Sequence, residues 1–121
     1  MIEIYLQLFF QHQIQIKMIH FQTNGFGTHK ATDKYLGIFQ DNFDKFCEVA
    51  QGKFGKFDLN KLEFNVSIVT DMESIENVLK NYVKILNKLD EYDGGNVNDL
   101  INIKESMVAD ANQLLYLLTF N

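Results

Sequence analysis

Residues 70–89, TDMESIENVLKNYVKILNKL, carry the most regular hydrophobic pattern in the chain. Apolar side chains recur there at alternating spacings of three and four residues, at Met72, Ile75, Leu79, Tyr82, Leu86 and Leu89. This spacing places them on one face of an α-helix that packs against other helices. Thr70 and Glu73 in front of it fit a capping box, in which each side chain bonds the backbone amide of the other. The stretch therefore predicts a bundle helix over 71–91.

Glycine signals divide the rest of the chain into segments of similar length. They lie at Asn24-Gly25-Phe26-Gly27, at Gly52 with Gly55, and at Gly94-Gly95. The four segments between them are about 2–22, 29–51, 71–91 and 97–119. Each has about 20 residues, which is too long for an ordinary strand and typical of bundle helices. The prediction is an all-α, antiparallel four-helix bundle, formed as a single domain over 1–121, with a long connection at about 52–70 between helices two and three.

The first segment is the least regular. Gln13-Ile14-Gln15-Ile16 alternates like a strand, whereas Ile2, Leu6, Phe9, Ile16 and Ile19 keep helical spacing over the whole segment. A strand would need a partner, and only 62–68 in the long connection alternates in a similar way. We therefore predict a helix over 2–22 and an extended stretch within 52–70. On the fourth segment, Asp110 interrupts the apolar face and needs a partner if it is buried, and Asn96 is a candidate cap.

Composition excludes several classes of protein. The chain of 121 residues has a formal net charge of −5, and its 11 basic residues are all lysine. Without arginine, a nucleic-acid reader and a polybasic membrane anchor are both disfavoured. The single cysteine, Cys47, excludes a disulfide framework and is expected to be a packed core residue. The N-terminal stretch lacks the pattern of a signal peptide, and no apolar run is long enough for a membrane span, so a cytoplasmic location is expected.

Five polar residues on or near the second helix are the candidates for chemistry. They are His20, His29, Asp33, Asp44 and Glu48. With Leu36 taken as the centre of the apolar stripe, the last four lie between about 20° and 120° around an ideal helix. This arrangement predicts a polar stripe along the edge of the apolar face. P-loop, nucleotide-fold, serine hydrolase and HExxH motifs are absent, and His12 has no carboxylate at a useful spacing, so no role is assigned to it.

Distance along the helix limits how these residues can act together. His29 and Asp44 are 15 residues apart, which is about 22 Å of helical rise, so they cannot bind one ion within one chain. Two copies of the helix packed antiparallel around a two-fold axis would place His29 and Asp33 of one chain opposite Asp44 and Glu48 of the other, twice. Imidazole and carboxylate groups together suit iron, manganese or zinc. The alternative is that the acidic residues are ordinary solvated positions and the histidines serve packing.

Residues 18–49, MIHFQTNGFGTHKATDKYLGIFQDNFDKFCEV, resemble the Dps-like mini-ferritins. In that family a His followed by an aromatic residue closes the first helix, and a second His with an acidic residue four positions on opens the second. An Asp-x-x-x-Glu pair completes the pattern. His20-Phe21, His29-x-x-x-Asp33 and Asp44-x-x-x-Glu48 occupy those places here. The connection from His20 to His29 is shorter than the family's, and a lysine-rich tail is absent.

The resemblance implies a ferritin-like protein that oxidises ferrous iron at a site shared between two-fold-related chains. His20, His29, Asp33, Asp44 and Glu48 would be the ligands, the chain would be a homo-oligomer, and ferric oxide would collect in a hollow shell. Two alternatives remain open. A helical interaction or structural protein could keep the fold without the activity and use the apolar residues of 52–70 as a partner-binding segment. An enzyme with His29 as general base is the third, although the sequence offers it no nucleophile.

Overall fold

The computed structural model describes residues 2–120, which form four α-helices and three short 3-10 helices. The α-helices are α1 (Glu3–Gln22), α2 (Phe26–Phe54), α3 (Met72–Asn87) and α4 (Asn98–Leu117). The 3-10 helices are η1 (Leu59–Lys61), η2 (Lys88–Glu91) and η3 (Leu118–Phe120). No strand occurs within 2–120. The all-helical prediction is therefore confirmed, including a helix rather than a strand in the first segment.

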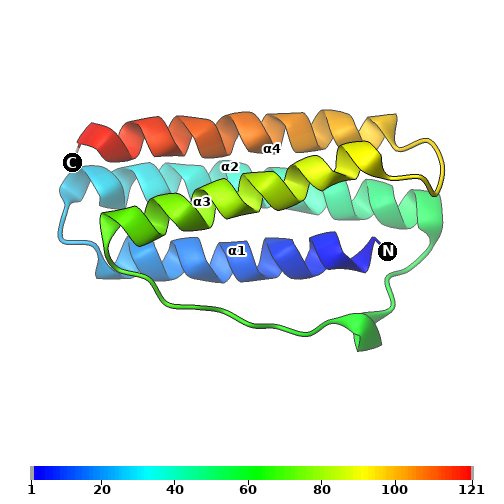
Figure 1. The fold of residues 1–121 in the computed structure, drawn as a ribbon, viewed down its shortest axis with the longest axis horizontal. Helices are drawn as coiled ribbons and strands as arrows, with labels where there is room; N and C mark the ends of the chain where they lie inside the picture. Colours follow the sequence, from blue (N-terminus) through cyan, green and yellow to red (C-terminus); the bar gives the residue numbers. More distant parts are fainter. Residues whose placement is uncertain (1, 121) are drawn as a thin grey trace.

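The long connection determines the direction of each helix. Figure 1 shows α1 and α2 running in opposite directions, after which the chain crosses the whole length of the bundle before α3 begins. As a result α2 and α3 point the same way, and α4 returns alongside them. α1 packs against α2 and α3, and α4 packs against the same two helices, so that α2 and α3 lie on a diagonal.

α3 contributes to the core the face that the periodicity predicted. Ile75, Leu79, Tyr82, Leu86 and Leu89 are all buried, and Met72 at the end of the series is half-buried. α2 contributes mainly aromatic side chains, and Phe9 of α1 packs its ring among three of them: its ring centroid lies 6.2 Å from that of Phe39, 5.3 Å from that of Phe43 and 5.0 Å from that of Phe46. Such tilted and edge-on contacts are favourable for aromatic pairs. The interior is therefore an α1–α2 aromatic layer covered by the aliphatic face of α3 and α4.

The helix ends differ in detail from the sequence prediction. α3 is capped by Asp71, whose carboxylate accepts a hydrogen bond from the Ser74 amide at 2.9 Å, so the predicted capping box at Thr70 is wrong. Asp71 takes the position because its short carboxylate reaches the amide three residues on. The N-cap of α4 is Val97, so the prediction of Asn96 as the cap is wrong by one residue, although the Asn96 side chain accepts a hydrogen bond from the Asn98 amide at 2.9 Å. Gly55 caps the C-terminal end of α2 with φ at +88°, a left-handed conformation that favours glycine.

Polar groups at the edge of the core have partners. Asp110 is half-buried and accepts a hydrogen bond from Asn42 at 3.0 Å, and burial raises the pKa of its carboxyl. The ammonium of buried Lys104 lies 2.8 Å from Asp90 and 2.7 Å from Glu105. These contacts link α4 to α2 on one side and to η2 on the other.

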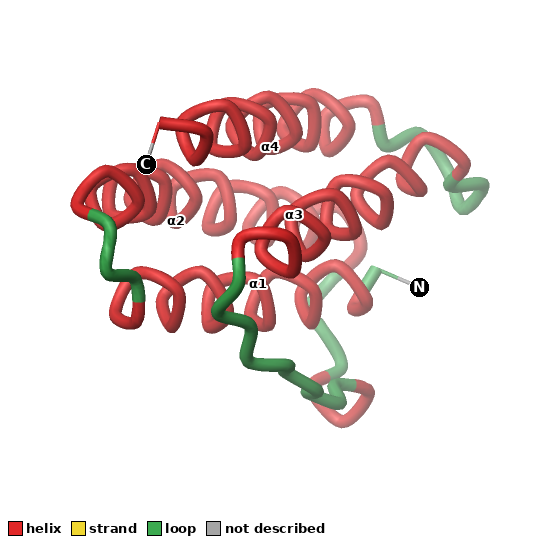
Figure 2. The backbone as a smooth tube through the Cα atoms, turned by 60° about the vertical axis from the view of Figure 1, so that its left-hand side comes forward, coloured by secondary structure: helices red, strands yellow, loops and turns green. Residues whose placement is uncertain are grey.

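Residues 55–71 form the connection between α2 and α3, close to the predicted 52–70. η1 occupies three of its positions, and 62–71 has no helix or strand. Figure 2 shows this segment running beside α1, on the side of α1 away from α4. No helix within residues 2–120 is long and apolar enough to cross a membrane.

Candidate metal site at one end of the bundle

The short link between the first two helices brings His20 and His29 together. His20 lies in the last turn of α1 and His29 near the start of α2, and only Thr23–Gly25 separate the helices. The two imidazole rings are stacked, with centroids 4.0 Å apart and planes inclined by 21°. His20 is buried, with 7% of its surface exposed, whereas His29 is exposed. The pair therefore sits at the surface of the bundle end with one ring covering the other.

Both rings are fixed through the same nitrogen. His20 Nδ1 lies 3.0 Å from the carbonyl oxygen of His29, and His29 Nδ1 lies 3.2 Å from the carbonyl oxygen of His20. His20 Nδ1 is also 3.0 Å from the hydroxyl of Thr32, which itself donates to the Thr28 carbonyl at 2.8 Å. A carbonyl oxygen only accepts hydrogen bonds, so each Nδ1 carries its hydrogen.

This arrangement leaves a lone pair on the Nε2 atom of each neutral ring. Within residues 2–120, neither Nε2 atom has a hydrogen-bond partner. Metal-binding histidines usually donate their other ring N–H to a backbone carbonyl or a carboxylate, which fixes the ring and raises its basicity as a ligand. The geometry of His20 and His29 therefore matches that of imidazoles prepared to bind a cation.

The three acidic candidates lie on α2 but away from its core face. Asp33, Asp44 and Glu48 are all exposed. The predicted edge position is wrong for them, because Leu36 is only half-buried and the buried side chains of α2 centre about 50° away from it on an ideal helix. The residues that define this centre are Thr28, Thr32, Tyr35, Phe39, Phe43, Phe46, Cys47 and Ala50. The stripe is thus an outward-facing surface of α2.

Within one chain the candidate ligands form two separate halves. Asp33 follows His29 by one turn at one end of α2, and Asp44 and Glu48 lie towards the other end. Asp44 accepts a hydrogen bond from Gln40 at 2.8 Å. Nowhere in residues 2–120 do three or more His, Cys, Asp or Glu side chains gather closely enough to hold an ion. A complete site from these five residues therefore requires a second chain.

Cys47 is buried, as expected of a packed cysteine. Burial, with a smaller contribution from the carboxylates of Asp44 and Glu48, raises the pKa of its thiol to about 12. A thiol with so high a pKa is almost entirely protonated near neutral pH and is a poor nucleophile.

His12 is the polar residue that the sequence did not single out. It is 2% exposed, its Nε2 lies 2.6 Å from the Tyr35 hydroxyl oxygen, and its ring stacks on that of Tyr82 at a centroid distance of 3.6 Å. Burial lowers the pKa of its imidazole to about 3. Its neighbours come from α2 and α3, far away in the sequence, so only the folded chain reveals this group.

Comparison with known protein families gives a match over most of the chain. Residues 20–118 match the model of a family described as a family of unknown function, DUF5856. The match runs from His20 through the end of α4, and it includes all five candidate ligands. No curated protein and no solved structure matches the chain. Because the matched region covers most of the 121 residues, the chain belongs to the DUF5856 family.

Proposed function

We propose that the chain is a ferritin-like protein that binds and oxidises ferrous iron at a site shared between two two-fold-related copies. His20, His29 and Asp33 of one copy and Asp44 and Glu48 of the other would hold the ion. The observation that carries the proposal is the His20–His29 pair, whose Nδ1 atoms are occupied by backbone carbonyls and whose Nε2 atoms are unpartnered within 2–120.

The order and direction of the helices support the proposal. Ferritin-like folds differ from simple up-and-down bundles in having one long crossover connection. The connection at 55–71 is such a crossover, since it spans the bundle from end to end and leaves α2 and α3 pointing the same way. Fold alone does not fix function, so this observation supports the architecture rather than the chemistry.

The spacing along α2 supports a site shared between chains. An antiparallel copy of α2 would bring Asp44 and Glu48 opposite His29 and Asp33, because the two pairs lie at opposite ends of one exposed surface. The same two-fold axis generates two identical sites. Carboxylate and imidazole ligands with exposed positions suit an ion that arrives from solvent, and the net charge of −5 favours the approach of cations.

The proposed oxidation of ferrous iron balances with hydrogen peroxide as the electron acceptor. Each ferrous ion gives up one electron to become ferric, and two such electrons with two protons reduce one molecule of hydrogen peroxide to two waters. The residues of the chain would bind the ferrous ion and stabilise the ferric product through the carboxylates of Asp33, Asp44 and Glu48. Their anionic oxygens favour the higher charge of the oxidised ion.

Subunit complementation tests the shared site directly. Ferric absorbance is followed after ferrous iron and peroxide are added to His29→Ala, to Asp44→Ala, and to an equal mixture of the two, unfolded and refolded together. Each variant alone lacks both sites of a dimer. Random pairing makes half of the dimers mixed, each with one intact site, so the mixture should recover about one quarter of the wild-type rate.

The matched control is a mixture of His29→Ala with Asp33→Ala. Both changes damage the same half of the site, so no pairing of these chains restores an intact site and the rate should stay at the level of either variant alone. Wild-type oxidation rates in both His29→Ala and Asp44→Ala would refute the proposal. Loss of activity in each variant without recovery in the first mixture would refute the sharing between chains.

A second candidate function rests on the exposed apolar side chains of the connection. Leu59, Phe64 and Ile68 have 67%, 52% and 66% of their surfaces exposed. Exposed apolar side chains often mark an interaction site, so the alternative is a helical module that binds another protein through 55–71. Sedimentation separates the two candidates, because a stable monomer cannot assemble the shared iron site.

A further inference from the structure

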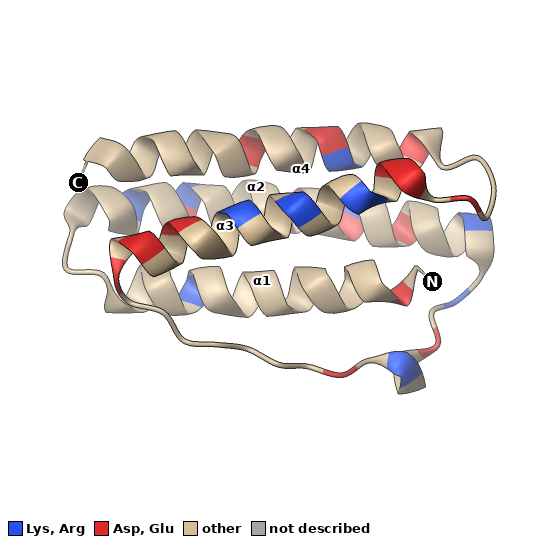
Figure 3. Ribbon diagram, in the orientation of Figure 1, with Lys and Arg blue, Asp and Glu red and all other residues tan. Residues whose placement is uncertain are grey.

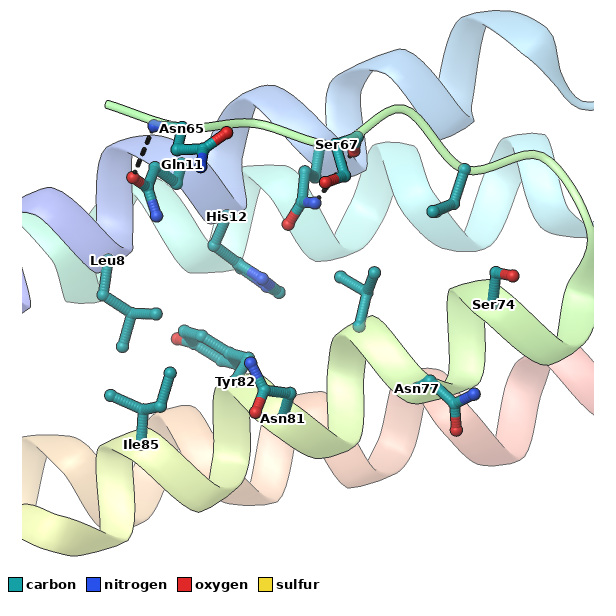
Figure 4. A pocket seen from close by; sticks show the side chains of 13 residues that line it. Leu8, Gln11, His12, Asn65, Ser67, Ser74, Asn77, Asn81, Tyr82 and Ile85 are labelled. Atoms are coloured by element: carbon teal, nitrogen blue, oxygen red, sulfur yellow. Dashed lines mark hydrogen bonds between the residues drawn. The ribbon is translucent and has the colours of Figure 1, made fainter. Parts of the chain in front are cut away.

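A cavity of about 450 Å³ lies between α1, α3 and the connection, away from the His20–His29 pair. Figure 4 shows its walls, which come from all three elements. Its volume is the share of roughly fifteen molecules of liquid water, and is within the range of ligand sites. The polar side chains that matter most here are Gln11, Gln15, Asn65, Ser67, Ser74 and Asn81. No charged side chain within 2–120 lines the cavity.

One wall carries a buried nitrogen without a partner. His12 lines the cavity, and its Nδ1 has no hydrogen bond within residues 2–120. The ring cannot turn away, because its Nε2 is held by the Tyr35 hydroxyl at 2.6 Å and its face stacks on Tyr82 with planes 7° apart (Figure 4). A buried polar atom without a partner costs about 1–3 kcal/mol. The Nδ1 atom itself is buried, so a bound molecule that bonds it and recovers that cost has to displace the side chains that cover it.

A second wall is an extended stretch of the connection, which lies beside α1 and is held in register by glutamines. Gln7 accepts a hydrogen bond from the Glu63 amide at 2.7 Å, and Gln11 accepts one from the Asn65 amide at 3.0 Å. Gln15 donates one to the Ser67 carbonyl at 3.0 Å. Four helical residues rise about 6.0 Å and two extended residues about 6.6 Å, so the two series stay in step.

Gln11 and Gln15 each use one polar atom of the side-chain amide on the connection, and the other polar atom remains for a ligand. Gln11 uses its oxygen on the backbone and keeps its NH₂ group, whereas Gln15 uses its NH₂ group and keeps its oxygen. Both line the cavity. α1 carries two charged residues, Glu3 and Lys17, and neither of them lines the cavity (Figure 3). The cavity therefore offers paired neutral donors and acceptors.

These features select the chemistry of the ligand. Hydroxyl groups both donate and accept, as amide side chains do, so adjacent hydroxyls suit a wall of Gln, Asn and Ser. An ionised ligand would lose its hydration without meeting an opposite charge. A hydrocarbon would leave His12 Nδ1 and the amides unpaired. We propose that the cavity binds a small uncharged polyol, of about monosaccharide size, with one hydroxyl on His12 Nδ1.

The test uses the full chain labelled with ¹⁵N and ¹³C, titrated with D-glucose and with myo-inositol. We expect saturable shifts of the His12 ring and of the Gln11 and Gln15 side-chain amides with at least one of these probes, at a dissociation constant below about 10 mM. Asn81→Leu should weaken binding at least about tenfold, because it removes an amide from the wall. Asn112→Leu, an exposed change on α4, should leave it unaltered.

The amide spectrum of each variant first establishes that it is folded. Shifts with both probes that stay linear up to about 100 mM would overturn the proposal, since they would indicate a cavity filled by water only. Saturable binding that is equal in Asn81→Leu and the wild type would also overturn it. D-glucose 6-phosphate that binds as tightly as the sugars would refute the requirement for an uncharged ligand.

Discussion

Acid should destabilise this protein through His12, an effect that the structure allows to be calculated. Burial lowers the pKa of His12 to about 3 in the folded chain, from the ordinary histidine value of 6.5. Between these values the unfolded chain binds a proton that the folded chain does not. The contribution of His12 to stability is therefore fully present above pH 6.5 and is lost as the pH falls towards 3. The predicted slope below pH 6 approaches about 1.4 kcal/mol per pH unit.

The loss of unfolding free energy can be calculated for the range from pH 7.5 to 5.0. Lowering the pH from 7.5 to 5.0 should remove about 2 kcal/mol of unfolding free energy through His12 alone. This loss of free energy changes by only about 0.1 kcal/mol for any pKa of His12 in the folded chain below about 4. The folded chain then binds almost no proton at pH 5.0, so protonation of the unfolded chain determines the loss. The raised pKa of Asp110 acts in the opposite direction at lower pH, since a carboxyl with a raised folded pKa favours the folded state as the pH falls.

The assay compares urea unfolding of the wild type and His12→Gln at both pH values. Glutamine does not titrate and retains a group that can bond the Tyr35 hydroxyl, and contributions from other residues, including Asp110, cancel in the comparison. The wild type should lose about 2 kcal/mol more than the variant between pH 7.5 and 5.0. An equal loss in both proteins would refute the assignment of His12 as a buried neutral imidazole.

Three further predictions concern packing, capping and reactivity. Leu79→Ala, at a fully buried position of α3, should lower the free energy of unfolding by about 2–5 kcal/mol, measured by thermal or urea unfolding. Leu59→Ala, at a site 67% exposed, should change it by less than about 0.5 kcal/mol. Similar costs for the two variants would contradict the described core. Asp71→Ala should cost about 1 kcal/mol and Thr70→Ala much less, and the reverse order would restore the capping box at Thr70. The Cys47 thiol, with its pKa raised to about 12, should not react with a disulfide reagent at about pH 8 until the chain is unfolded by urea, and rapid native labelling would show that it is accessible.

The helices could be predicted because their signals are local. The three-and-four spacing from Met72 to Leu89 specifies a buried face without knowledge of its partners, and the structure buries that face. The rotation of α2 was less predictable. The sequence analysis placed the centre of the apolar stripe at Leu36. In the structure the rings of Phe39, Phe43 and Phe46 contact Phe9, and the buried face of α2 centres about 50° away from Leu36 on an ideal helix.

The site residues also divide into those whose proximity the sequence could predict and those for which it could not. His20 and His29 are nine positions apart across a short link, so the sequence alone places them near each other. The cluster around His12 could not be predicted, because Tyr35 and Tyr82 reach it from other helices. The glutamines at 7, 11 and 15 were a visible helical series, but their match to 63, 65 and 67 depends on where the connection crosses α1. A register between distant segments needs the folded chain.

The end-to-end crossover also shapes how the chain folds. It divides the molecule into two helical hairpins, α1–α2 and α3–α4, joined covalently only through 55–71. Each hairpin closes a short loop, whereas docking one on the other must close a longer one, so hairpin formation is expected to precede docking. A protease cut within 62–71 would turn the docking step into a bimolecular association, whose midpoint would then depend on concentration. The molecule is in this sense a tethered heterodimer of two hairpins, held together by the packing of α2 on α4 and α1 on α3.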